Sequence, residues 1–125
     1  MDNLLIEGTI NTPKIDFNAS TNLLKIWGRS IPEHPINFYK PIENWIDTYL
    51  NTSPATVTLE IYLDYLNTHS TECMFILLKK LADYETKHAN SIKVIWIYDE
   101  DDEDMESMGE DLGEIVKLPI ELKTL

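Results

Sequence analysis

The segment Ser91 to Tyr98 constrains the fold more than any other part of the chain. It reads Ser-Ile-Lys-Val-Ile-Trp-Ile-Tyr, so its apolar side chains are nearly continuous. A strand that is apolar on both faces is typical of a sheet with parallel neighbours, because the crossover helices cover that sheet. We therefore expect Ser91 to Tyr98 to be a central strand that is covered on both faces or nearly so.

Strand and helix patterns alternate along the rest of the chain. Ala55 to Leu63 is rich in β-branched and aromatic residues, which predicts a strand, and Asp64 to Asn67 should then leave the sheet. Apolar residues at three- and four-residue spacing predict a helix from Pro41 to Asn51, after a tighter turn at Ile36 to Tyr39. The other predicted elements are an opening meander (Leu4 to Ile10, Lys14 to Phe17, Leu23 to Trp27), a helix from Ser70 to Asn90, a third helix with Met105, Met108, Leu112 and Ile115 on its apolar stripe, and a short strand at Leu118 to Leu122.

This order of elements predicts an α/β (α+β) fold with a single mixed β-sheet and helices packed mainly on one side. The chain has 125 residues, of which 43% are hydrophobic, and this is enough for one buried core. We expect residues 1–125 to form a single domain. Tyr39, Trp45 and Trp96 lie on the apolar faces of their segments, so we expect them to pack in the core.

The sequence favours a cytoplasmic protein. No stretch approaches the roughly 20 apolar residues that a membrane helix needs, and Met1 to Ile10 lacks a basic leader region. A single cysteine, Cys73, excludes an internal disulfide and fits a reducing compartment. We expect no association with membranes.

Acidic residues are concentrated in one segment. Ten of the 22 acids lie between Asp99 and Glu114, without a lysine or arginine among them, and the formal net charge of the chain is -12. Binding to nucleic acid is disfavoured, because affinity for phosphates needs clustered basic residues. The segment fits a basic partner, a hydrated surface or a divalent cation. One hypothesis is an acidic decoy that blocks a basic protein by nucleic-acid mimicry.

The first six acids of this segment, Asp99 to Asp104, invite comparison with a calcium-binding loop. Glu110 lies at the twelfth position, where such a loop carries a glutamate, but Asp104 occupies the sixth position, which requires glycine. We therefore predict no metal site.

The sequence offers little support for an enzyme. Its four glycines form no phosphate-binding motif, and no GxSxG motif is present. Cys73 lies four residues after His69, a spacing that permits a nucleophilic pair in a small hydrolase. A lone cysteine in an apolar helical stretch is more often a core residue. We predict neither a catalytic residue nor a cofactor.

A cluster of hydroxyl residues, Thr68, Ser70 and Thr71, marks the predicted start of the second helix. One interpretation is helix capping by one or two of these side chains. The other is a phosphoacceptor site, because the free N–H groups and the positive end of the dipole at a helix N-terminus stabilise a phosphate. The pattern by itself leaves both open.

A set of short motifs follows in a fixed order along the chain: Glu7-Gly8-Thr9, Thr12-Pro13, Gly28-Arg29-Ser30 with Pro32-Glu33, Phe38-Tyr39 with Pro41-Ile42, Leu66-Asn67-Thr68, Trp96 to Tyr98, Asp101 to Met105, and Gly109-Glu110-Asp111. This ordered set resembles the SiaC family of bacterial regulatory phosphoproteins. The resemblance covers nearly the whole chain. It implies a STAS-like domain, similar to anti-sigma-factor antagonists, that works as a signalling switch and not as a catalyst.

The resemblance also implies partners and site residues. A dedicated kinase would phosphorylate Thr68, with Ser70 as the second choice, and a PP2C-type phosphatase would remove the phosphate. The unmodified form would bind and activate an output protein such as a diguanylate cyclase, which promotes cyclic-di-GMP synthesis and biofilm formation. His69 stands where a small hydroxyl residue is expected. Asn67, His69, Ser70, Arg29 and Ser30 are the predicted partner-binding residues.

Overall fold

The computed structural model describes all residues from Met1 to Leu125. In chain order its elements are β1 (Leu4–Ile6), β2 (Lys14–Asn18), β3 (Leu23–Ser30), α1 (Pro35–Leu50), β4 (Val57–Leu66), α2 (Thr68–Lys87), β5 (Ile92–Tyr98), α3 (Glu103–Val116) and β6 (Ile120–Thr124). No helix has a stretch that is both long and apolar enough to cross a bilayer.

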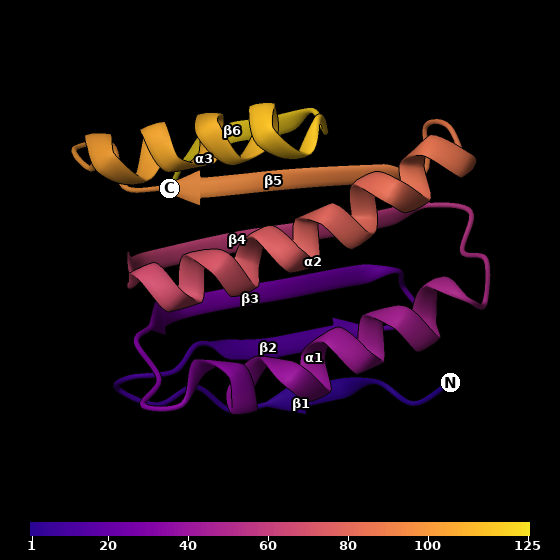
Figure 1. Cartoon of the computed structure of the whole chain (residues 1–125), viewed down its shortest axis with the longest axis horizontal. Helices are drawn as coiled ribbons and strands as arrows, with labels where there is room; N and C mark the ends of the chain where they lie inside the picture. The colour runs from indigo at the N-terminus through magenta and orange to yellow at the C-terminus, as the bar shows by residue number, and fades with distance from the viewer.

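The strands form one six-stranded sheet in the order β1-β2-β3-β4-β5-β6. The first three strands are antiparallel neighbours, and β3 to β6 are parallel. Each parallel connection crosses over through a helix, and all three helices lie on the same face of the sheet (Figure 1). The predicted α/β fold with a single mixed sheet and helices on one side is confirmed.

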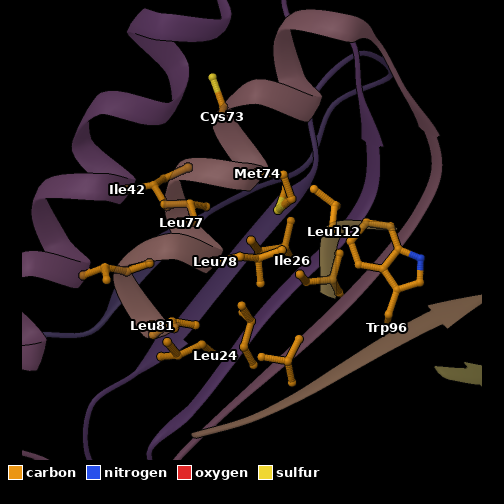
Figure 2. Close-up of a cluster of buried hydrophobic side chains, with 14 of the residues drawn as sticks. Leu24, Ile26, Ile42, Cys73, Met74, Leu77, Leu78, Leu81, Trp96 and Leu112 are labelled. Atoms are coloured by element: carbon orange, nitrogen blue, oxygen red, sulfur yellow. The ribbon is translucent and has the colours of Figure 1, made fainter. Parts of the chain in front are cut away.

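The core lies between the sheet and the helices. Side chains alternate between buried and exposed along β2, and between buried and partly exposed along much of β3 and β4, and the buried ones face the helices. Figure 2 shows Leu77 and Leu78 of α2 in one cluster with Leu24 and Ile26 of β3. Burial of such side chains stabilises the fold by roughly 1.5–3 kcal/mol each.

The three aromatic residues expected in the core pack there to different degrees. Tyr39 and Trp96 are almost completely buried. Trp45 is only partly buried: its ring lies 5.3 Å from that of Phe17 and stacks on Tyr49 at 4.9 Å, while its Nε1 donates to the backbone oxygen of Asp2. Trp45 therefore covers the edge of the core.

Helices cover only one face of strand β5, so the expected cover on both faces, or nearly so, is met only in part. Val94 and Trp96 are buried under the helices. On the opposite face of the sheet no helix packs, and Ile95 is partly exposed there, whereas Ile97 is buried. The apolar run in β5 therefore reflects two different environments, a face that the helices cover and an open sheet face on which the side chains are buried to different degrees.

Helix α1 begins at Pro35, six residues before the predicted start. Pro35 occupies the first turn, where the missing N–H has no consequence. Pro41 lies inside the helix with an exposed side chain, so the chain accommodates the loss of one backbone hydrogen bond there. Buried Tyr39, Ile42 and Ile46 share one helix face, and their packing outweighs the local cost of Pro41.

Strands β3 and β4 run further than their sequence patterns indicated. Asp64 to Leu66 was predicted to leave the sheet, but Tyr65 and Leu66 still pair with Arg29 and Ser30. The register shifts after Gly28, so Asp64 is an extra residue in a β-bulge. The bulge breaks the alternation of side chains, and this is why the pattern suggested an earlier end.

The ends of several other elements also differ from the prediction. Strand β1 stops at Ile6, because the following chain folds into a turn in which the Thr9 N–H donates to the Thr12 oxygen at 2.9 Å. On α3, Ile115 is 62% exposed and Val116 is buried in its place. β6 begins at Ile120 and not at Leu118.

Candidate functional site

The predicted site residues gather where β3 and β4 end and α2 begins. Parallel strands end at the same edge of a sheet, so Ser30 and Leu66 are register partners there. The backbone N–H of Asn67, the next residue, donates to the Ser30 oxygen at 3.2 Å. The first turn of α2 therefore starts from a fixed position on the sheet.

Helix α2 is capped by Asn67 and not by a hydroxyl side chain. Asn67 Oδ1 accepts a hydrogen bond from the Ser70 N–H at 2.9 Å, and the Asn67 backbone oxygen accepts from the Thr71 N–H at 2.9 Å. Thr71 Oγ1 also donates to that backbone oxygen. The prediction of a hydroxyl cap is wrong, because the amide of Asn67 reaches the N–H that a hydroxyl would have served.

Thr68 is the first residue of α2, and its side chain is exposed. Its hydroxyl makes no hydrogen bond to another protein group, because Asn67 carries out the capping. The N–H groups of Thr68 and His69 have no acceptor within the helix. The result is a free hydroxyl beside unpaired backbone donors at the positive end of a helix dipole.

Two predicted site residues point into the protein. Ser70 is 0% exposed, and Ser30 is 0% exposed with its Oγ 2.6 Å from the hydroxyl of Tyr39. A kinase could not reach Ser70, and a partner could not contact Ser30, without local unfolding. Burial therefore argues against both residues as surface contacts, since they face the core under the helix start.

Arg29 and His69 do lie on the surface. The Arg29 guanidinium is 3.6 Å from the carboxylate of Asp64, and both side chains are 45% exposed. His69 extends into solvent, with its Nδ1 4.0 Å from a carboxylate oxygen of Glu72. Exposed pairs of this kind contribute little to stability, so both side chains are free to contact a partner.

Three features of this end of the molecule were not predicted. Ile36 is 75% exposed and Tyr65 is 55% exposed, although apolar residues of this size usually pack inside. A shallow pocket of about 420 Å³ separates the starts of α1 and α2. It is lined by Glu33, His34, Pro35, Ile36, Asn37 and His69. Sequence patterns could not find it, since it depends on how two helices meet.

Cys73 and His69 do not form a nucleophilic pair. Cys73 is buried, with its Sγ 4.0 Å from the Pro35 backbone oxygen, and Figure 2 shows it above the main cluster of core side chains. Burial raises the pKa of the Cys73 thiol above its ordinary value, which disfavours the reactive thiolate. His69 points toward Glu72.

Part of the acidic segment serves the local structure. Tyr62 donates to the carboxylate of Asp99 at 2.7 Å, and this hydrogen bond raises the pKa of Tyr62 to about 12. Asp102 caps α3 by accepting from the Met105 N–H at 3.1 Å, and Glu106 accepts from Tyr98. Helix α3 begins at Glu103, so Glu103 and Asp104 are helical and not part of a loop, and no three His, Cys, Asp or Glu side chains of the chain are grouped as metal ligands.

Comparison with known protein families identifies the chain. The model of the SiaC family of regulatory phosphoproteins matches residues 6–125. The chain belongs to this family. An uncharacterised protein of Pseudomonas aeruginosa (strain UCBPP-PA14) is 26% identical over 123 residues, which cover 98% of this chain and 97% of that protein.

Solved structures of SiaC from Pseudomonas aeruginosa have the same fold. One is 25% identical with a TM-score of 0.91 and full coverage of both chains. Another contains the diguanylate cyclase SiaD in complex with SiaC, which is described as its activator; the match has 25% identity, a TM-score of 0.91, and covers 98% of this chain and 99% of that one. This SiaC-family chain is a regulatory phosphoprotein and not an enzyme.

Proposed function

We propose that this chain is a cytoplasmic signalling switch in which phosphorylation of Thr68 controls binding to an output protein. The unmodified form binds and activates a diguanylate cyclase. A dedicated kinase adds the phosphate and a PP2C-type phosphatase removes it. Residues 1–125 act as one regulatory domain. The observation that carries the proposal is the exposed Thr68 hydroxyl, left free by the Asn67 cap at the start of α2.

The geometry around Thr68 supports a phosphate more than a structural role. A phosphate there adds about -1.5 to -2 charges at neutral pH. It would lie beside the unpaired N–H groups of the first helical turn, which stabilise an anion. The modification would therefore leave α2 intact, so the folded protein can exist in both states.

The surface around Thr68 supports control of partner binding. Ile36 is exposed and lines the same pocket as His69, and Tyr65 is exposed at the end of β4, three residues before Thr68. Both provide apolar contact area. Arg29 and His69 provide polar contacts, and Asn67 fixes the backbone between them. A partner that covers this surface must remove water from the Thr68 hydroxyl or from its phosphate. Because a charged phosphate is much more costly to desolvate, phosphorylation should weaken partner binding strongly.

The proposal is tested by measuring the affinity of the chain for the diguanylate cyclase of its own organism. We expect Thr68→Glu, or the enzymatically phosphorylated protein, to bind at least about tenfold more weakly than the unmodified protein, a difference of about 1.4 kcal/mol. Thr21→Glu is the matched control, because Thr21 is exposed in the turn before β3 and its hydroxyl makes no hydrogen bond. An equal loss in both variants would refute the proposed site.

Mass spectrometry of the protein from its native cells tests the modification separately. We expect a phosphate on Thr68 that a PP2C-type phosphatase removes and that Thr68→Ala abolishes. A phosphate confined to another residue, or none under any growth condition, would contradict the proposal.

A further inference from the structure

We propose that the free edge of β6, together with the groove beside α3, binds an extended basic segment of a partner protein by strand addition. This surface shares no residue with the Thr68 surface, so the proposal goes beyond the phosphorylation switch. It also gives a role to the acids of α3 that do not take part in the hydrogen bonds of the fold.

Strand β6 is the last strand of the sheet and lies at its edge (Figure 1). The Leu125 N–H donates to the Tyr98 backbone oxygen at 3.0 Å, so the backbone N–H of Leu125 points toward β5. Backbone groups alternate in direction along a strand, and the N–H and C=O groups of Ile120, Leu122 and Thr124 therefore face away from the sheet. An edge with such unpaired groups is a template for another strand.

A groove of about 530 Å³ runs beside this edge. Gly109 and Gly113 lie one helical turn apart on the side of α3 that faces β6, and both line the groove. Gly109 packs directly against Trp96 and Leu122, so α3 lies close to the sheet there. Ile120 and Leu122 contribute apolar surface to the lining. Side chains that project from an added strand toward α3 would enter this groove.

The charges around the groove favour a basic occupant. Glu110 and Glu114 of α3 line it and form no salt bridge within the chain. Lys117 is the one basic residue of the lining. On the other face of β6, Glu121 is already paired with Lys93 at 3.8 Å. A partner strand with Lys or Arg at every second position, directed toward α3, complements this arrangement.

Nuclear magnetic resonance on the full chain tests the proposal directly. The probe is an acetylated and amidated heptapeptide of alternating lysine and valine, Lys-Val-Lys-Val-Lys-Val-Lys. We expect saturable shifts centred on the amides of Ile120, Leu122 and Thr124, and slower hydrogen exchange at these amides. A peptide with glutamate in place of lysine should not bind.

Two double variants separate a specific groove from general attraction to an acidic chain. Glu110→Gln with Glu114→Gln removes two charges from the groove, whereas Glu103→Gln with Asp104→Asn removes two from the start of the same helix. We expect at least about fivefold weaker peptide binding in the first pair and less than about a twofold change in the second. Equal losses in the two pairs would overturn the proposal.

A proline tests the backbone contribution. Thr124→Pro removes an N–H that faces away from the sheet, which an edge strand tolerates, so the fold should be retained. We expect roughly two- to tenfold weaker binding, the effect of one net hydrogen bond. The proposal fails if the peptide shifts lie elsewhere on the chain. It also fails if the chain alone forms a dimer that Thr124→Pro disrupts, since a second copy would then occupy the edge.

Discussion

Asn67 Oδ1 lies 2.9 Å from the backbone nitrogen of Ser70 and caps helix α2. Helix capping and phosphate acceptance were both considered for the hydroxyl residues Thr68, Ser70 and Thr71, and this contact assigns them to different residues. Asn67 provides the cap, and Thr68 keeps a free hydroxyl on the surface. The stability of α2 and the modification of Thr68 should therefore respond to different substitutions.

Removing the cap should cost stability, whereas removing the Thr68 hydroxyl should not. We expect Asn67→Ala to lower the free energy of unfolding by about 1 kcal/mol, the usual value for loss of an N-cap. Thr68→Ala should change it by less than about 0.5 kcal/mol, because the exposed hydroxyl makes no contact. Urea unfolding measures both. If Thr68→Ala were as destabilising as Asn67→Ala, Thr68 would have a structural role that the geometry does not indicate.

The buried hydrogen bond between Ser30 and Tyr39 should appear as a coupling energy. Its 2.6 Å contact joins the end of β3 to α1, and burial raises the pKa of Tyr39 above its ordinary value. We expect Ser30→Ala or Tyr39→Phe to cost about 1–3 kcal/mol, because each leaves one buried hydroxyl unpaired. The double variant should cost less than the sum of the two. Strict additivity in denaturant unfolding would show that the pair is not coupled.

Two glycines of α3 should respond oppositely to alanine. A Cβ at Gly109 would lie 2.6 Å from the Trp96 ring and 2.8 Å from Leu122, so Gly109→Ala should destabilise by about 1–3 kcal/mol. At Gly113 the nearest atom would be 3.4 Å away, so Gly113→Ala should be neutral or stabilise by up to about 1 kcal/mol through helix propensity. Thermal unfolding of the two variants provides a direct comparison. A neutral Gly109→Ala would contradict the close packing of α3 on the sheet.

Glu85 should make the stability of the chain depend on pH in the acidic range. Its carboxylate accepts hydrogen bonds from the backbone N–H groups of Ile92, Asn90 and Ser91, and these hydrogen bonds lower the pKa of Glu85. A pKa that is lower in the folded state adds stability above the unfolded value of about 4.3. That stability is lost as the pH falls through the folded value.

The Glu85→Gln variant should therefore lose stability at pH 7 and show a smaller further loss on acidification than the unchanged protein. Urea midpoints at pH 7 and at pH 3 measure the difference. Glu72→Gln, an exposed residue of the same helix, is the control and should keep the original pH dependence. Parallel pH profiles for the unchanged protein and the Glu85→Gln variant would contradict this role of Glu85.

Local patterns predicted the elements well where packing and periodicity agree. The apolar run of β5 and the alternating pattern of β4 predicted strands, and the spacing of Met74, Leu77 and Leu81 predicted α2. The start of α1 was predicted too late because proline is common in the first turn of a helix, and Pro41 was assigned to that position. In the structure the helix continues on both sides of Pro41, since Tyr39, Ile42 and Ile46 form one buried face. Tertiary packing outweighs a local signal there.

The sequence by itself determined the order of strands and helices, the single sheet and the candidate Thr68, because periodicity, turn residues and family motifs are local properties of the chain. Only the tertiary structure decided which side chains are buried and which are exposed to solvent. It buried Ser30 and Ser70, exposed Ile36 and Tyr65, and left the β6 edge open beside α3. Burial and edge exposure depend on how distant segments pack, which no local pattern records.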